Sequence, residues 1–569
     1  MTKAVQSTGS RVRPPSTRRA TIVAQDPSIQ RNGRIVTAEI DIPAELLEPG
    51  PTGYRVMVVD YDASNNVLYK AADPGGDTAP LVVSDDPEVL LADPTQHALN
   101  AYAIVMRILS RFEFALGRRV AWGFGGHQLH VSPHAFAEAN AFYAREQRAL
   151  LLGYFQGRSG NRVYTCLAHD IVAHETAHAL LDGLRRRYLE PSSPDQAAFH
   201  EGFADVVALL SILALKDVVA AVLTDANGPL IASDALTEEA LKSTVLFGLA
   251  DQMGQELSAI HGKPLRSSIK MEPGRDYMSD PAYQEEHRRG EILVASMLAA
   301  YLRIWTGRIA RLGETTPGFK DRGMVVEEGA RVADHLLTMA IRALDYAPPT
   351  DITFPDYLSA LLTIDREVVP DDSRFGYRDT LIVSFRDFGI AVSERAGDDG
   401  AWPLWEVALS YGRSRFDSLV RDREEVFRFL WENRRDLALG EKGYLEVQSV
   451  RACHRIGPDG FILRETVAEY VQILNLKAEE LKAEVGIDSP AGIKPWTDIR
   501  LFGGGSLIFD EYGRLKFHIA NGIAKTSADR RRQQTRLNAL ASAGLLSGET
   551  TELRVAGLHR ARMLAEELP

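Results

Sequence analysis

The chain has 569 residues, of which 45% are apolar and 25% charged, and its formal net charge is −12. This composition excludes a wholly disordered, collagen-like or low-complexity chain. The acidic balance argues against a protein whose main task is to cover phosphate backbone, so no nucleic-acid partner is expected.

The number of cysteines and the length of the apolar stretches indicate in which cellular compartment the protein is expected. Cys166 and Cys453 are the only cysteines, so no disulfide framework supports the fold and a reducing environment is the simpler interpretation. The sequence shows no secretory signal, and its apolar stretches fall short of the roughly 20 residues that cross a bilayer. We therefore expect a cytoplasmic protein without a membrane partner.

The N-terminal part of the chain is predicted to contain an arm and a small β-rich unit. Residues 1–32 combine arginines with Pro, Ser and Thr, which predicts a flexible basic arm. Residues 33–90 show apolar alternation around a turn at residues 64–66, which indicates a β-hairpin.

The rest of the chain divides into two predicted regions. Residues 91–395 contain the polar residues that indicate chemistry. The acidic, Gly-containing residues 396–400 then mark the boundary of residues 396–569, an α+β region of unknown role. Hairpins are predicted to turn at residues 457–460 and 510–513. The Gly-rich segment 502–506 is interpreted as a turn or bulge.

A His-Glu-x-x-His pattern lies in an apolar segment with helical periodicity. His174 and His178 are four residues apart, so one helical turn places both imidazoles on the same side. Two neutral imidazoles that reach one point suit Zn²⁺, and Glu175 can act on a water activated by the metal. This pattern predicts the core of a zinc hydrolase.

A second helix is predicted to supply the third ligand. Ser193 forms a capping box with Gln196, so a helix begins at residue 194. Glu201 and Asp205 lie one turn apart on it. Glu201 completes the metal site, and Asp205 accepts the outer N–H of a ligand histidine.

A purely structural role is the alternative for these residues. Glu201 and Asp205 are also compatible with a salt-bridged, solvated helix face. His169 and His200 do not match the one-turn geometry and are interpreted as residues beside the site rather than ligands.

Together these residues resemble the thermolysin-like zinc metallopeptidases, the gluzincins, in which two His and one Glu from successive helices bind the metal. Upstream, Asn140 to Tyr143 (Asn-Ala-Phe-Tyr) resembles the edge strand of that family, which implies substrate binding by Asn140 and Ala141. The resemblance also implies that Arg275, before Met-Ser-Asp-Pro, binds a substrate carbonyl.

Two further roles follow from the resemblance. It implies that His287 and Tyr188 stabilise the oxyanion, although the family spacing differs by one residue at each of these positions and at Arg275. Ile212 stands where a calcium-binding Glu is expected, so one zinc ion per chain and no calcium are predicted.

The predicted fold is α+β: a thermolysin-like domain with a β-rich N-terminal lobe and a mostly helical C-terminal lobe, followed by an accessory domain. The predicted function is a zinc metalloendopeptidase acting on protein or peptide substrates, with a regulatory or recruiting partner at the accessory domain. Two alternatives stay open: a catalytically silent scaffold of the same fold, and a zinc hydrolase of a non-peptide substrate.

Overall fold

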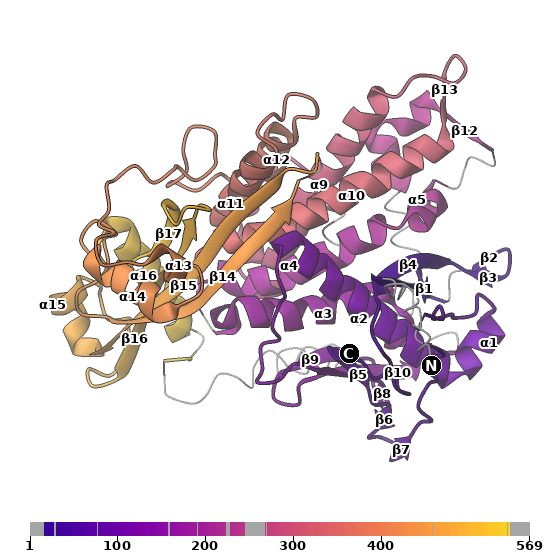
Figure 1. Ribbon diagram of the computed structural model, residues 1–569, viewed down its shortest axis with the longest axis horizontal. Coiled ribbons are helices and arrows are strands. Elements are labelled where there is room, and N and C mark those ends of the chain that lie inside the picture. Colours follow the sequence, from indigo (N-terminus) through magenta and orange to yellow (C-terminus); the bar gives the residue numbers. More distant parts are fainter. Residues whose placement is uncertain are drawn as a thin grey trace, which may run out of the picture.

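The computed structural model describes an α+β protein whose sheets and helices form separate layers (Figure 1). It describes residues 16–27, 30–76, 78–157, 160–190, 192–223, 228–244, 268, 270–457, 459–542 and 544–546. The first 15 residues of the predicted arm and the end of the predicted accessory domain lie outside these ranges.

A strand replaces the second half of the predicted arm. β1 (Thr17–Val23) pairs antiparallel with β4 (Thr37–Pro43), and Ala20 and Ile22 are buried. The prediction of a flexible arm to residue 32 is therefore wrong for the described residues from 17 onward. Buried Ala20 and Ile22 stand at alternate positions among polar residues, which is the pattern of a half-buried strand.

The main N-terminal sheet combines parallel and antiparallel strands. Its order is β11-β10-β8-β5, and β9 pairs antiparallel with β10. The strands are β5 (Val56–Val58), β8 (Leu129–Phe136), β9 (Ala141–Ala144), β10 (Ala149–Gln156) and β11 (Arg162–Tyr164).

The predicted unit 33–90 is part of this sheet and not a separate body. Its hairpin is confirmed as β6 (Tyr61–Asp62) paired with β7 (Val67–Leu68). However, β5 pairs parallel with β8, and one apolar core continues from this unit into the helices. Short elements complete the region: β2 (Gln30–Arg31), β3 (Arg34–Ile35) and α1 (Pro87–Ala92).

Helices form the second layer. In Figure 1, α3 (His169–Leu184) lies between the sheet and the remaining helices. Beside and above it are α2 (Pro94–Leu116), α4 (Pro194–Leu213), α5 (Lys216–Val222), α9 (Glu286–Ala310), α10 (Arg322–Ala343), α11 (Phe354–Val368) and α12 (Tyr377–Arg386), with the small pair β12 (Leu230–Ala232) and β13 (Phe319–Asp321).

Helices α4 and α9 are long and apolar enough to cross a membrane, but both belong to the protein interior. In their most apolar windows, 83% and 78% of the residues are buried inside the protein. They cross at Gly202 and Gly290, where a Cβ on Gly202 would lie 2.9 Å from the Gly290 carbonyl oxygen. The absence of side chains at this point allows the two backbones to touch.

The C-terminal region is built on a four-stranded antiparallel meander. Its strands are β14 (Tyr444–Ile456), β15 (Ile462–Lys477), β16 (Asp498–Phe509) and β17 (Leu515–Asn521), with α13 (Phe416–Leu419), α14 (Arg423–Glu432), α15 (Leu481–Val485) and α16 (Ser527–Ser542) around them. Both predicted hairpins are confirmed by the pairing of β14 with β15 and of β16 with β17. The Gly-rich segment 502–506, however, lies inside β16 and pairs with β15 without a register shift, so it is neither a turn nor a bulge.

This sheet is docked on the helical layer through buried charges. The Arg455 guanidinium donates to Glu465 at 2.6 Å and also contacts Asp345, which receives two hydrogen bonds from Arg118. Side chains of the sheet, such as Val467 and Phe517, belong to the same apolar core as the helices. One face of the described C-terminal sheet thus packs on the helices, while Phe429, Leu507 and Phe509 belong to a separate apolar core within the C-terminal region.

Candidate functional site

Helix α3 presents the two histidines of the predicted motif. It begins directly after Ala168, and all residues from Ile171 to Asp182 are buried. Because His174 and His178 are one turn apart, both rings lie on one side, with their Nε2 atoms 2.8 Å apart. The rings are perpendicular, at a centroid distance of 4.4 Å.

Helix α4 brings its carboxylates to the same point. The Ser193 hydroxyl caps the helix by accepting from the Gln196 N–H at 3.2 Å. The Gln196 side chain donates to the carbonyls of Arg187 and Glu190 instead, so the reciprocal half of the predicted capping box is not formed. Glu201 Oε2 lies 3.6 Å from the Nε2 atoms of both His174 and His178. Asp205 Oδ1 lies 2.8 Å from His174 Nδ1, on the far side of that ring.

These donor atoms fit a bound cation. The Nε2 atoms of His174 and His178 and one Glu201 oxygen form a triangle with sides of 2.8, 3.6 and 3.6 Å. Tetrahedral zinc with bonds of about 2.0–2.1 Å separates its ligands by about 3.3 Å, which these values bracket. Buried His and Glu groups here are thus able to hold a metal ion.

The surroundings of His174 are strongly anionic. Burial by itself lowers the pKa of the imidazole, but the Asp205 carboxylate, with Glu201 and Glu175, outweighs burial and raises the pKa of His174 well above its ordinary value. A cation at Nε2 is favoured by the same carboxylates, and it must displace a proton.

Glu175 connects the metal site to the sheet. Its Oε2 accepts a hydrogen bond of 2.8 Å from the backbone N–H of Tyr143 in β9. The opposite edge of β9 pairs with β10, so the edge that carries the Tyr143 N–H faces α3. Asn140 is buried immediately before β9, its side-chain oxygen accepts from the Ala141 N–H at 2.9 Å, and its carbonyl accepts from Gly153 N–H.

Asp182 is a buried residue of the site that our sequence reasoning did not select. It lies one turn after His178. Its carboxylate accepts a hydrogen bond of 2.9 Å from the Tyr143 hydroxyl and forms an ion pair with Arg145 at 3.3 Å. Its spacing from His178 was the signal available in the sequence. Asp182 fixes β9 against α3, and therefore fixes the distance between Glu175 and the edge strand.

The structure places Tyr188 in the core. Its side chain is 1% exposed, and its hydroxyl donates to the Pro348 carbonyl at 2.6 Å. Tyr188 packs edge-on against Phe199. A phenol has a single hydrogen to donate, so in this structure Tyr188 does not offer it to an oxyanion.

Arg275 and His287 lie near the start of α9. The Arg275 side chain is 62% exposed and pairs with Asp280. The His287 Nδ1 atom lies 2.7 Å from Glu285, whose carboxylate caps α9. Burial opposes ionisation of Glu285, but hydrogen bonds from His287 and from the Arg288 N–H prevail and lower its pKa to about 2.

Arg289 is a second residue that the sequence interpretation missed. Its guanidinium is buried, pairs with Asp195 in the first turn of α4, and donates to the carbonyls of Met278 and Tyr283 at 3.2 and 3.3 Å. Arg289 thereby ties the segment that carries Arg275 to the helix that carries Glu201. No motif in the sequence distinguished it from its neighbour Arg288.

His200 and His169 are both buried, and the structure separates their roles. The His200 ring stacks on His178 at a centroid distance of 4.6 Å, and together with His178 and Glu201 it forms a further group able to hold a metal. His169 lies at the start of α3, where burial and the charge of Arg107 lower its pKa to about 3. It is therefore a neutral core residue at physiological pH.

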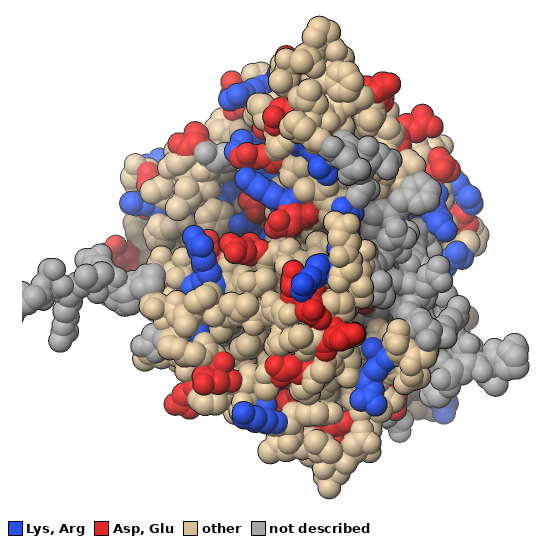
Figure 2. All heavy atoms as spheres, turned by 90° about the vertical axis from the view of Figure 1, so that its right-hand side faces the viewer, with Lys and Arg blue, Asp and Glu red and all other residues tan. Residues whose placement is uncertain are grey.

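On the face shown in Figure 2, acidic and basic side chains are interspersed.

No protein-family model matches this chain, and no curated protein is detectably similar to it in sequence.

Proposed function

We propose that the protein is a zinc-dependent metalloendopeptidase. The observation that carries the proposal is the convergence of His174, His178 and Glu201 on one point. Beside this point, Glu175 is hydrogen-bonded to the edge of a strand. Two imidazoles and one carboxylate leave a fourth position of a tetrahedral cation open, which is the arrangement of catalytic rather than structural zinc.

The chemistry divides between the cation and the protein. When bound, zinc would polarise the scissile carbonyl and make water acidic enough to attack at neutral pH. Glu175 accepts the proton of the attacking water and then transfers it to the leaving amine. Asp205 holds the His174 ring through Nδ1, so that Nε2 keeps its lone pair for the metal.

The proposed substrate is an extended peptide that lies along β9. The edge of this strand faces α3, and its Tyr143 N–H donates to Glu175. A peptide added to this edge would place its scissile bond beside the base. Asn140 and Ala141 shape the beginning of the edge, and Ala141 has no long side chain to block it.

Oxyanion stabilisation is assigned to His287, and recognition of a substrate carbonyl to Arg275. The Tyr188 hydroxyl donates its hydrogen to the Pro348 carbonyl, so of the two predicted oxyanion donors we assign the role to His287. One such donor contributes about 2.7–4 kcal/mol of transition-state stabilisation. Arg275 is exposed, and it would have to exchange its Asp280 partner for substrate.

Two other functions compete with this proposal. A silent scaffold would need no base, yet Glu175 is present and is oriented by β9. A non-peptide hydrolase would need no strand edge beside the metal site. Both observations favour a peptidase.

Incubation of a proteome-derived peptide library with zinc-loaded protein tests the proposal. New termini, identified by mass spectrometry, are expected with the wild type and not with Glu175→Gln at equal zinc content. Cleavage by both proteins, or by neither, would contradict the proposal. The sequence flanking the new termini would define the substrate preference.

A further inference from the structure

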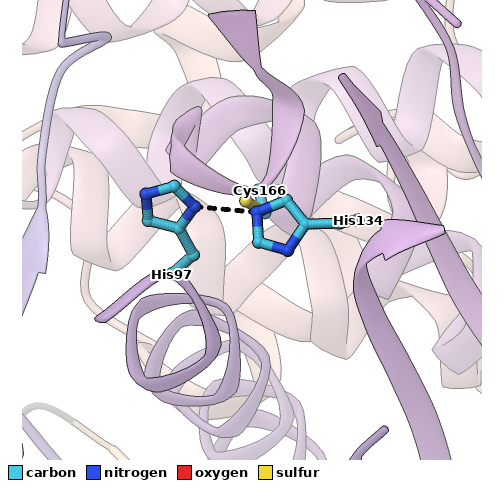
Figure 3. Close-up of side chains that lie close together, drawn as sticks. All are labelled: His97, His134 and Cys166. Carbon is cyan, nitrogen blue, oxygen red and sulfur yellow. Dashed lines mark hydrogen bonds between the residues drawn. The ribbon is translucent and has the colours of Figure 1, made fainter. Parts of the chain in front are cut away.

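A second group of metal-binding side chains lies outside the proposed catalytic site. His97 from α2, His134 from β8 and Cys166 from the 3₁₀ turn before α3 place one ligand atom each within 4.8 Å of the others. All three residues are buried. Figure 3 shows the two rings edge to edge, with the sulfur beside the hydrogen bond that joins them.

The outer nitrogen of each ring faces an acceptor. His97 Nε2 lies 3.0 Å from the Leu90 carbonyl oxygen, which can only accept a hydrogen bond. His134 Nδ1 lies 2.7 Å from Asp60 Oδ2, and the other Asp60 oxygen accepts the His134 backbone N–H at 3.0 Å. Both outer nitrogens therefore carry a hydrogen.

This hydrogen bonding leaves two lone pairs facing each other. With their outer nitrogens protonated, neutral His97 and His134 direct Nδ1 and Nε2 at each other across 2.8 Å. Two acceptors at this distance repel unless a cation lies between or beside them. That cation is either a proton, which makes one ring an imidazolium, or a metal ion.

The surroundings favour a metal ion over a proton. The Cys166 sulfur lies within 4.8 Å of both inner nitrogens and supplies a third ligand atom, which a proton shared by two rings does not need. The Cys166 side chain is fully buried, so a thiolate is stable there only if a cation compensates its charge. The carboxylate on His134 and the carbonyl on His97 are the partners that metal-binding histidines have on their outer nitrogens.

We propose that His97 Nδ1, His134 Nε2 and Cys166 Sγ bind a second metal ion, a thiolate-preferring cation of the zinc or copper(I) class. Two imidazoles and a thiolate suit these cations and not Ca²⁺ or Mg²⁺. The proposal does not depend on the peptidase activity, because the two sites share no residue.

The site would fasten the start of α3 to the sheet. Cys166 belongs to the 3₁₀ turn Thr165–Leu167, which runs directly into α3. Its carbonyl already accepts from Asn100 of α2 at 2.9 Å. A cation there would join α2, β8 and this turn, and would hold α3 at the position from which His174 and His178 project.

Cobalt substitution of the full-length protein tests the proposal. Thiolate ligation gives cobalt(II) a charge-transfer absorption in the near ultraviolet, which the His174, His178 and Glu201 donors cannot produce. We expect this band in the wild type and in His174→Ala, and its loss in Cys166→Ser. Cys453→Ser, the matched control at another buried cysteine, should keep it.

Metal content gives a second readout. After zinc loading and gel filtration, we expect about two ions per wild-type chain and about one in Cys166→Ser or in His174→Ala. A wild-type protein without the thiolate band would overturn the proposal even if Cys166→Ser failed to fold. Asp60, His134 and His97 would then form a chain that shares a proton.

Discussion

The orientation of His174 depends on one carboxylate of the neighbouring helix. Asp205→Asn keeps the shape of the side chain but removes the charge 2.8 Å from His174 Nδ1. We expect zinc affinity to fall about 10–100-fold, the usual effect of removing such a partner. Competition with a chromophoric chelator measures the change, and Asp217→Asn on the exposed surface of α5 is the control. An unchanged affinity would contradict the role given to Asp205.

Tyr188→Phe separates a catalytic role from a structural one. Because the Tyr188 hydroxyl donates to the buried Pro348 carbonyl, its removal leaves that oxygen without this donor. We expect a loss of about 1–3 kcal/mol in the free energy of unfolding. The kcat on a cleaved peptide should change less than about 3-fold, whereas loss of an oxyanion donor costs about 10²–10³. Denaturant unfolding and steady-state rates decide between these outcomes.

The residues of the site differ in how well the sequence predicts them. His174 and His178, like Glu201 and Asp205, are one helical turn apart, so local periodicity predicts that they share a face. The two pairs were predicted to meet because a catalytic zinc ion takes three protein ligands, and Glu201 was the candidate for the third. The burial of Tyr188 depends on tertiary contacts. The pairing of Arg275 with Asp280 depends on the conformation of the loop between them, which residue spacing does not specify.

At the scale of elements, the crossing of α4 and α9 sets the position of Glu201. A Cβ on Gly202, the next residue, would lie 2.9 Å from the Gly290 carbonyl oxygen and 3.1 Å from its Cα. We expect Gly202→Ala to cost about 1–3 kcal/mol of stability by overpacking. It should also weaken zinc binding, because the helices must separate.

Gly307→Ala is the matched control for that prediction. Gly307 lies on α9, the partner helix of this crossing, and a Cβ there would meet no atom within 4 Å. It should stabilise the protein by about 0.5–1 kcal/mol, because alanine restricts the unfolded chain. Equal effects of the two substitutions in thermal unfolding would refute the argument from close packing.

Elements with a local signal were predicted well, and the others were not. Hairpins and the start of α4 follow from turn and capping residues, which act over a few positions. The glycines of β16 suggested a turn, but this segment is a strand. Glycine is required at position 505 because a Cβ there would lie 2.9 Å from the side chains of Tyr470 and Ala520 on the neighbouring strands. Such close approach is visible only in the folded sheet.

At the scale of the whole molecule, buried charges join the C-terminal sheet to the helices. Asp345 accepts from Arg118 and Arg455, and its pKa is lowered: burial opposes ionisation, but the two guanidinium groups prevail. Asp345→Asn should cost about 3–5 kcal/mol at pH 7, because it leaves buried guanidinium charge uncompensated.

This prediction carries a pH dependence. Because the pKa of Asp345 is lower in the folded than in the unfolded protein, its ionisation stabilises the fold at pH values above the unfolded-state pKa of about 3.9. This stabilisation is lost as the pH falls toward the folded-state pKa. The difference in stability between wild type and Asp345→Asn should therefore shrink below about pH 4. Asp334→Asn, at an ion pair in which Asp334 is 41% exposed, should cost at most about 1 kcal/mol. Urea unfolding at several pH values provides the comparison.

The extent of the domains was the least predictable feature. Composition suggested boundaries near residues 32, 90 and 395, but β5 pairs with β8, and the C-terminal sheet shares the core of the helices. Long-range pairing leaves no mark in local composition. An α+β class was predictable, because strand-like and helical periodicities occupy different segments.

The most direct test of the peptidase account is a zinc titration of the metal-free protein, followed by the rate of cleavage of one internally quenched peptide. The account predicts no cleavage without zinc and a rate that rises as zinc binds. Glu175→Gln should bind zinc with similar affinity but cleave at least about 10²-fold more slowly. Cleavage by the metal-free protein, or an unaffected rate in Glu175→Gln, would contradict it.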